Sequence, residues 1–264
     1  MRIDKYLAEH SLAESRQKAK EMISGGFVTL NGRIVSKDST DVGETDRVEV
    51  TGRPYPYVSR GGLKLEAAKS AFSLDFANKI ACDLGASTGG FTDLMLRSGA
   101  RRVHAVDCGS GQLHPDIASD PRVVNMEGIN ARELCANDLG TFCDIVVSDL
   151  SFISQTLVFE SVTKILSDKG EFVSLIKPQF EAGRENIGKG GIVKDLHVHI
   201  SVIKHVTDVA RAHHLYCTGL IRSPIRGGDG NTEYLAYFHY SRDGSDILPL
   251  DISEISDLVL KGKT

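Results

Sequence analysis

The pattern of apolar and polar positions along the chain changes near residue 60. From there to about residue 240, short apolar runs alternate with longer segments whose apolar residues recur at helical spacing. The helical segments include 155–166 and 197–214, and the apolar runs are 79–85, 102–109, 123–128, 143–151, 171–178, 216–223 and 233–240. Strands that alternate with helices predict an α/β fold. We expect a Rossmann-like, doubly wound sheet with helices on both faces and ligands at the carboxyl ends of its strands.

The first fifty residues follow a different pattern. Apolar residues at helical spacing in 2–10, and a segment 15–26 that opens on a capping serine and closes on two glycines, predict two short helices. The next run alternates and turns on Asn31-Gly32, which indicates a β-hairpin, and 42–50 adds a short strand. These elements predict a small α+β domain with a very small core.

A stretch rich in proline and tyrosine, TGRPYPYVSRGG (51–62), separates the two patterns. Prolines stiffen the backbone and tyrosines can pack, so we interpret this stretch as a short, semi-rigid linker. We place the first domain, linker included, at residues 1–58 and the second at residues 59–264.

The composition of the 264-residue chain narrows the classes of function. No apolar run approaches the ~20 residues needed to cross a bilayer, and the charged start is unlike a signal peptide, so we expect a cytoplasmic protein without a membrane partner. The five cysteines form no C-x-x-C pair, and neither His197 with His199 nor His213 with His214 shares a helix face, so we expect no metal. A net charge of −4 leaves nucleic-acid binding to local basic patches.

Three kinds of ligand are conceivable for the glycine turn DLGASTGGF (83–91). A phosphate-binding loop needs a lysine where Phe91 stands, and a dinucleotide fingerprint needs a glycine at Ser87. Both patterns are therefore disfavoured. The remaining pattern, D-L-G-x-x-x-G-G, resembles the first motif of class I methyltransferases, and this resemblance implies S-adenosylmethionine as the cofactor.

The resemblance also implies which residues hold that cofactor. Asp83 ends the first strand of the second domain, and the glycines after it let the backbone approach the ligand. Asp107 ends the next strand, where an acid can bind both ribose hydroxyls, and Glu127 or Asn130 are the alternatives for the adenine contact. The implied cofactor-binding residues are Asp83, Gly85, Ser87, Gly89, Gly90, Phe91, Asp107, Glu127, Asn130 and Asp149.

The motif after the fourth strand bears on the methyl acceptor. Amino-group methyltransferases typically carry an Asn-Pro-Pro-aromatic run there and cytosine-carbon enzymes a cysteine, whereas this chain has SDLSF with Asp149. Three more charged residues have apolar neighbours in the sequence, an environment that is unusual for ionisable groups: Lys64, Lys177 and Glu233. Any one of them alone reads as an ordinary ion-pairing residue. All four at the switch side of one sheet predict a catalytic cluster.

Lys-Asp-Lys-Glu in this order resembles the tetrad of the RrmJ/FtsJ-like ribose 2′-O-methyltransferases. With VSRGGLKL, DLGASTGGFTD, VSDLSFIS, LIKPQFE and SPIRGGDGNTEY, the chain resembles the TlyA family of ribosomal RNA 2′-O-methyltransferases, often labelled hemolysin A, over roughly residues 1–240. The resemblance implies methyl transfer to a ribose 2′-hydroxyl. Lys177 is then the candidate general base, Lys64 and Asp149 orient it and the substrate, and Glu233 fixes one of the lysines.

The first fifty residues resemble the S-four-type RNA-binding domain in the order of their elements and in residues such as Asn31-Gly32. Ribosomal RNA or a ribosomal subunit is therefore the implied partner, and a basic helix beside the hairpin suits phosphate contacts. Two glycine-containing loops of the second domain carry further basic residues, although an ordinary surface loop explains them equally well. The candidate RNA-binding residues are Arg2, Arg16, Lys18, Lys20, Arg33, Arg184, Lys189 and Arg226.

Two other functions are compatible with parts of this pattern. An RNA-binding protein could retain an inactive methyltransferase fold, but the intact turn and the complete tetrad argue against it. A membrane-lytic hemolysin would need a spanning helix or a strongly basic amphipathic segment, and the sequence has neither.

Overall fold

The computed structural model describes residues 1–10, 12–13, 15–244 and 247–262. The chain divides into two compact units, Met1–Pro56 and Tyr57–Thr264, and each is described by itself. The boundary expected from the sequence, after residue 58, lies within the same linker.

The first unit packs two short helices against a small antiparallel sheet. Ser15 caps the second helix by accepting a hydrogen bond from the backbone N–H of Lys18. The hairpin turns at Asn31 and Gly32 because both adopt the left-handed conformation that a two-residue turn between strands requires. The elements are α1 (Ile3–Glu9), α2 (Arg16–Ser24), β1 (Val28–Leu30), β2 (Arg33–Ile34) and β3 (Val48–Val50), with the strands in the order β2-β1-β3.

The two tyrosines of the linker pack on different units. The Tyr55 hydroxyl donates a hydrogen bond to Glu21 at 2.7 Å and accepts one from Lys18 Nζ at 2.6 Å, both in the first unit. The Tyr57 hydroxyl donates to Glu66 at 2.8 Å within the second unit. Each tyrosine therefore ties its end of the linker to its own unit.

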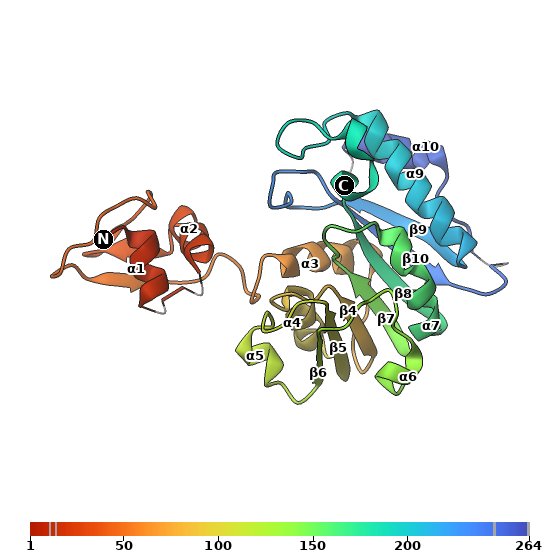
Figure 1. Ribbon diagram of the computed structural model, residues 1–264, viewed down its shortest axis with the longest axis horizontal. Coiled ribbons are helices and arrows are strands. Elements are labelled where there is room, and N and C mark those ends of the chain that lie inside the picture. Colours follow the sequence, from red (N-terminus) through yellow and green to blue (C-terminus); the bar gives the residue numbers. More distant parts are fainter. Residues whose placement is uncertain (11, 14, 245–246, 263–264) are drawn as a thin grey trace. The chain divides into compact units, whose positions relative to one another are not determined.

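The second unit contains a seven-stranded sheet in the order β6-β5-β4-β7-β8-β10-β9 (Figure 1). Neighbouring strands are parallel from β6 to β8, and β10 runs antiparallel to both β8 and β9. This arrangement confirms the Rossmann-like sheet that the alternating pattern predicted. The strands are β4 (Ile80–Leu84), β5 (Arg102–Asp107), β6 (Val123–Glu127), β7 (Cys143–Ser148), β8 (Leu166–Ile176), β9 (Leu215–Arg222) and β10 (Tyr234–Tyr240).

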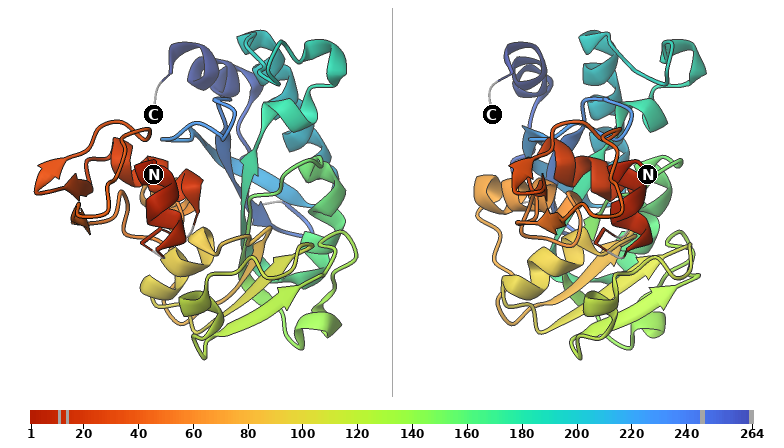
Figure 2. Two further views of the ribbon diagram at one scale, coloured as in Figure 1. Left: turned by 60° about the vertical axis from the view of Figure 1, so that its left-hand side comes forward. Right: turned by 90° about the vertical axis from the view of Figure 1, so that its left-hand side faces the viewer.

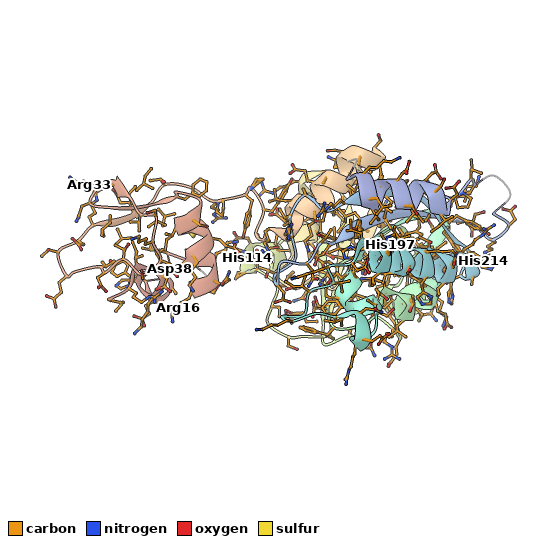
Figure 3. The ribbon with its side chains drawn as sticks, turned by 90° about the horizontal axis from the view of Figure 1, so that it is seen from above. Arg16, Arg33, Asp38, His114, His197 and His214 are labelled. Carbon is orange, nitrogen blue, oxygen red and sulfur yellow. The ribbon has the colours of Figure 1, made fainter. Side chains whose placement is uncertain are left out.

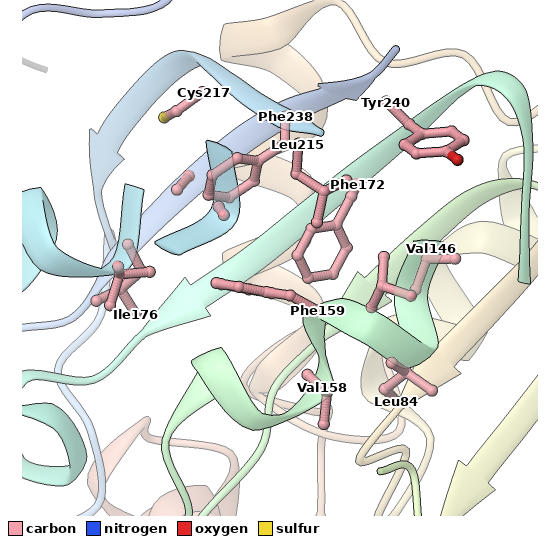
Figure 4. Packing of buried hydrophobic residues seen from close by; sticks show 14 of the residues in the cluster. Leu84, Val146, Val158, Phe159, Phe172, Ile176, Leu215, Cys217, Phe238 and Tyr240 are labelled. Atoms are coloured by element: carbon pink, nitrogen blue, oxygen red, sulfur yellow. The ribbon is translucent and has the colours of Figure 1, made fainter. Parts of the chain in front are cut away.

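Helices cover both faces of this sheet, each over its own hydrophobic core (Figure 2). Leu65 of α3 and Leu94 of α4 belong to one core, and Ile203 of α9 and Phe159 of α7 belong to the other. Figure 4 shows the second core, where the ring of Phe159 meets that of Phe172 edge-on at a centroid distance of 6.1 Å. The helices are α3 (Gly61–Phe72), α4 (Gly90–Arg97), α5 (Pro115–Ala118), α6 (Ala136–Leu139), η1 (Gln155–Val158), α7 (Phe159–Ile165), α8 (Pro178–Glu181), η2 (Arg184–Asn186), α9 (Leu196–Ala212) and α10 (Ile252–Lys261).

The topology brings four distant segments to one edge of the sheet. The chain order reverses between β4 and β7, so the loops that follow these two strands diverge and leave a crevice at their carboxyl ends. Because β10 is antiparallel, its first residue, Tyr234, pairs with Ile176, the last residue of β8. The amino end of β10 therefore lies at the same edge as the carboxyl ends of β4, β7 and β8.

Candidate active site

The four charged residues singled out in the sequence meet at this edge of the sheet. Lys64 lies on the first turns of α3, Asp149 directly follows β7, Lys177 directly follows β8, and Glu233 directly precedes β10. Lys64 and Lys177 are each 7% exposed, and Glu233 is 2% exposed. Charged side chains this deeply buried are rare unless they are paired.

The four side chains form a continuous row of alternating charge. Lys64 Nζ lies 2.8 Å from Glu233 Oε2 and 3.3 Å from Asp149 Oδ2. Asp149 Oδ1 lies 2.6 Å from Lys177 Nζ. Asp149 thus bridges the two lysines, and Glu233 pairs with Lys64. The sequence predicted that Glu233 would fix one lysine, and the geometry identifies which.

The charge on Asp149 depends on its two neighbours. Burial alone would raise the pKa of this carboxyl, but the charges of Lys64 and Lys177, with their hydrogen bonds, outweigh it and hold the pKa below its ordinary value. Asp149 is therefore an anion at neutral pH. Among the described residues, Lys64 lies within ion-pair distance of two carboxylates, and Lys177 of the shared one alone.

A cavity of about 300 Å³ opens beside the row of charges. Most of the expected cofactor-binding residues line it, and so do all four charged residues. Its walls comprise Ser59, Arg60, Gly61, Lys64, Asp83, Gly85, Ala86, Ser87, Thr88, Gly90, Phe91, Asp149, Ser151, Lys177, Gly228 and Glu233. Ser59, Arg60, Thr88 and Ser151 were missed in the sequence, because polar residues of loops leave no periodic signal.

Asp83 presents an unsatisfied oxygen to this cavity. The side chain is 1% exposed, and one oxygen accepts a hydrogen bond from Thr92 Oγ1 at 2.7 Å. Its Oδ1 has no hydrogen-bond partner among the described residues. Burial raises the pKa of Asp83 to about 7, against the effect of the Thr92 hydroxyl. A cationic or hydrogen-bond-donating ligand at this position would satisfy the oxygen.

The glycines of the turn are required by packing as much as by a ligand. Gly85 has φ +82°, and a Cβ there would lie 2.8 Å from the carbonyl oxygen of Asp149. Gly89 has φ +94°, and its Cβ position is filled by Leu113 and Ile117. The expectation that these glycines serve ligand approach is therefore incomplete, because the chain itself occupies the space. A side chain at residue 85 would displace the turn that carries Asp149.

Four expected cofactor contacts do not line the cavity: Gly89, Asp107, Glu127 and Asn130. Asp107 lies just behind the turn, where Oδ2 accepts from the backbone N–H of Ser87 at 2.9 Å and Oδ1 from that of Gly109 at 2.8 Å. The Glu127 carboxylate accepts from the backbone N–H groups of Gln112 and Leu113. Asp107 and Glu127 therefore order the loops around the turn through hydrogen bonds to backbone N–H groups, which could not be predicted from a sequence pattern.

An exposed aromatic residue stands beside the row of charges. Phe152 is 88% exposed and has φ +66°, a strained conformation for a bulky residue. Its ring lies 5.3 Å from that of Phe180, and Lys177 Nζ lies 5.7 Å from the Phe180 ring. Strain of this kind concentrates at functional sites. Phe152 carries no sequence signal of its own, because a single aromatic residue in SDLSF does not reveal its exposure or its backbone conformation.

The basic residues of the first unit are more internally paired than the sequence suggested. Arg16 lies 2.7 Å from the fully buried Asp4, and its charge and that of Arg2 overcome the effect of burial and lower the pKa of Asp4 to about 2. Lys20 pairs with Asp38 at 3.3 Å, which also pairs with Arg2. Lys18 donates to Tyr55. A helix expected to offer its charges to phosphate thus uses them partly within the unit.

Arg33 is placed differently from that helix. It lies on the exposed hairpin, and among the described residues it has no ion-pair partner. In Figure 3 it is labelled at one end of the first unit, apart from Arg16 and Asp38. The expectation that the basic helix and the hairpin with Arg33 contact phosphate together stays a prediction.

The two basic loops of the second unit are joined to each other. The Asn231 amide donates to the carbonyl of Gly191 at 2.9 Å and accepts from the backbone N–H of Val193 at 3.1 Å. Gly228 of the RGGDGN loop, next to Arg226, lines the cavity, whereas Arg184 and Lys189 are exposed and do not. The RGGDGN loop thus forms part of the cavity wall through Gly228, and the loop that follows Arg184 is held to it by Asn231.

No group of three or more metal-ligating side chains occurs within the described parts of the chain. His199, one of the paired histidines, is buried and hydrogen-bonds Tyr234 and the carbonyl of Val193. Across the same described residues, no helix is long and apolar enough to cross a membrane.

Comparison with known proteins agrees with this geometry. Residues 57–240 match the family of FtsJ-like methyltransferases, and residues 1–48 match the S4 domain. The chain is 39% identical to the 16S/23S rRNA (cytidine-2′-O)-methyltransferase TlyA of Mycobacterium tuberculosis, over 92% of this chain and 91% of that one. It is 40% identical to Hemolysin A of Brachyspira hyodysenteriae, over 90% and 99% of the two chains.

A solved structure from Streptococcus thermophilus, described as a candidate hemolysin, superposes with a TM-score of 0.79 at 39% identity, covering 99% of this chain and 96% of that one. These matches span both units, and they include the segments that carry the glycine turn and the four charged residues. The chain therefore belongs to the FtsJ-like methyltransferases and, among them, to the TlyA family, with an S4 domain ahead of the methyltransferase domain.

Proposed function

We propose that this protein transfers a methyl group from S-adenosylmethionine to a ribose 2′-hydroxyl of ribosomal RNA. The observation that carries the proposal is the row Glu233–Lys64–Asp149–Lys177, buried beside a cavity at the switch point of a methyltransferase fold. The name of the Mycobacterium relative supports ribosomal RNA as the substrate and makes cytidine the first nucleotide to examine.

The cavity fits the proposed cofactor. The free oxygen of Asp83 suits the ammonium group at the methionine end, and the backbone around Ser87 and Gly90 can approach the ligand closely. Asp107, which accepts a hydrogen bond from the backbone N–H of Ser87, is the proposed ribose contact. S-adenosylmethionine supplies a methyl group already activated on a cationic sulfur.

The chain must then align the acceptor and remove its proton. A ribose hydroxyl is a weak nucleophile, so positioning and proton transfer are the catalytic requirements. Lys177 Nζ is the proposed acceptor of that proton, because it faces less negative charge than Lys64. Asp149 holds both lysines in place, and Glu233 fixes the position of Lys64 through their ion pair. Phe152 offers its exposed ring to the nucleobase, by the stacking that proteins use for unpaired bases.

Replacing Asp107 with alanine should weaken binding of S-adenosylmethionine by about 1.5–3 kcal/mol, because a charged acceptor for hydroxyl groups is lost. The anchor of the Ser87 backbone is lost as well. Calorimetry on the purified protein measures this, and Asp116→Ala, an exposed acid on α5, is the matched control. An unchanged affinity in Asp107→Ala would move the ribose contact elsewhere.

Reversing charge at Arg33 and Lys37, both exposed, should weaken binding to ribosomal RNA. It should also reduce the slope of affinity against salt by about 1–2, since fewer phosphate contacts release fewer counterions. Affinity for the cofactor should not change. Arg16 and Lys20 are poorer targets because reversal would break their ion pairs with Asp4 and Asp38.

Binding is titrated over a range of salt concentrations, and Arg101→Glu, an exposed arginine of the second unit, is the control. A doubly reversed protein that binds RNA with the wild-type salt slope would show that the hairpin is not a phosphate contact.

The function itself is tested by mapping 2′-O-methyl groups in ribosomal RNA with and without the protein, in cells and with purified components. A methyl group that appears only with protein and cofactor supports the proposal. Transfer to a base nitrogen or carbon, or no transfer to RNA or either ribosomal subunit, would contradict it.

A further inference from the structure

The second serine of the SDLSF segment contacts the proposed base. Lys177 Nζ donates a hydrogen bond to Ser151 Oγ at 2.9 Å. Ser151 lies at the mouth of the cavity and is one of its walls. The cofactor turn and the four charged residues account for neither its hydroxyl nor its position.

The loop that carries Ser151 is held at both ends. At its start, the backbone N–H of Asp149 donates to the carbonyl of Leu84 at 3.0 Å. At its end, Ser154 Oγ donates to Glu181 at 2.6 Å, and the backbone N–H of Gln155 donates to the same carboxylate at 2.7 Å. The left-handed backbone of Phe152 turns the chain between these anchors.

One short turn therefore presents two acceptors to one lysine. Asp149 Oδ1 lies 2.6 Å and Ser151 Oγ 2.9 Å from Lys177 Nζ. A neutral lysine amine has two N–H donors and one lone pair. When both donors are directed at these two acceptors, the lone pair has a single remaining direction, which is into the cavity that Lys177 lines.

We propose that Ser151 is a positioning residue that orients the Lys177 amine, so that its lone pair faces the ribose hydroxyl. This inference rests on the proposed function and adds a fifth residue to the site. Without the Ser151 hydroxyl, one N–H loses its acceptor and the amine can rotate, so the productive orientation is populated only part of the time. Binding of cofactor and RNA does not require this orientation.

The test is a kinetic comparison on the full-length protein with ribosomal RNA and S-adenosylmethionine. Ser151→Ala should lower kcat about tenfold, the factor that corresponds to about 1.4 kcal/mol, with KM for RNA and Kd for the cofactor within about twofold of wild type. Ser151→Thr, which keeps a hydroxyl at a position with ordinary backbone, should restore kcat to within about threefold of wild type. A purely structural role would not produce this split or this rescue.

Ser201→Ala is the matched control, because it removes an exposed hydroxyl of α9 that donates to the carbonyl of His197 and lies outside the loop that carries Ser151. Wild-type kcat in Ser151→Ala would overturn the inference, as would an equal loss in Ser201→Ala or a failure of Ser151→Thr to restore turnover. Thermal unfolding and cofactor binding of each variant identify a folding defect, and a Ser151→Ala protein that loses both also contradicts positioning. Inactive wild-type protein would instead refute the proposed function.

Discussion

Lys177→Ala is expected to lower the rate of methyl transfer about 10³-fold, within the range that a general base contributes. The fold and the affinity for S-adenosylmethionine should remain nearly unchanged, because Lys177 is not a proposed contact of the cationic sulfur. A group that acts only in the transition state lowers turnover without altering ground-state binding. Single-turnover transfer of a labelled methyl group to ribosomal RNA measures the rate, and calorimetry measures the affinity.

Lys177→Arg distinguishes a base from a cation. A guanidinium keeps its proton at neutral pH, so arginine should not restore activity if Lys177 accepts a proton. Lys164→Ala, at an exposed lysine on α7 that pairs with Glu160 at 2.7 Å, is the control and should be fully active. Substantial activity in Lys177→Arg would make Lys177 an electrostatic group and remove its role as base.

Asp149→Asn is expected to have the largest combined effect on activity and stability. Among the described residues, Asp149 is the only carboxylate shared by Lys64 and Lys177, which are both 7% exposed. Its loss leaves two buried ammonium groups facing each other with one remaining anion, Glu233. Breaking a buried ion pair costs about 3–5 kcal/mol, and we expect about 3 because the Asp149 side chain keeps 21% exposure.

The stability difference between wild type and Asp149→Asn should depend on pH. The pKa of Asp149 is lower in the folded than in the unfolded protein, so its contribution is present above the unfolded value and is lost as pH falls through the folded value. The free energies of unfolding of the two proteins should therefore differ at pH 7 and become equal in strong acid. Denaturant unfolding over a pH series measures this, and methyl transfer should be undetectable in the variant.

Asp144→Asn is the control for this experiment, because Asp144 lies at the other end of β7, where it accepts a hydrogen bond from the backbone N–H of Ile80 at 2.8 Å. It should retain turnover and lose less stability than Asp149→Asn. Equal stability of wild type and Asp149→Asn at pH 7 would mean that the ion pairs of Asp149 with Lys64 and Lys177 do not stabilise the fold.

The elements of the fold and the ionisable residues of the candidate site could be predicted from the amino-acid sequence. Short apolar runs predicted every strand of the large sheet, because strands covered by helices on both faces are largely apolar. Asn31-Gly32 predicted the hairpin, because few residues adopt the left-handed backbone it requires. The glycine turn excluded phosphate and dinucleotide loops through residues that those loops need. The four ionisable residues stood out through their apolar neighbours, which is a local property.

The contacts between these side chains follow from the tertiary structure and could not be predicted from the sequence. The antiparallel β10 brings Glu233 to Lys64 and leaves Asp149 to bridge both lysines, and no local pattern encodes that order. The ion pair between Arg16 and the buried Asp4 shows that the basic helix uses part of its charge inside the first unit. This pair could not be predicted, because its partners are twelve positions apart and are brought together by the packing of the core. Ser151 and Phe152 became visible as part of the site for the same reason. Their contacts depend on loop geometry, and loop geometry is set by distant hydrogen bonds such as those to Leu84 and Glu181.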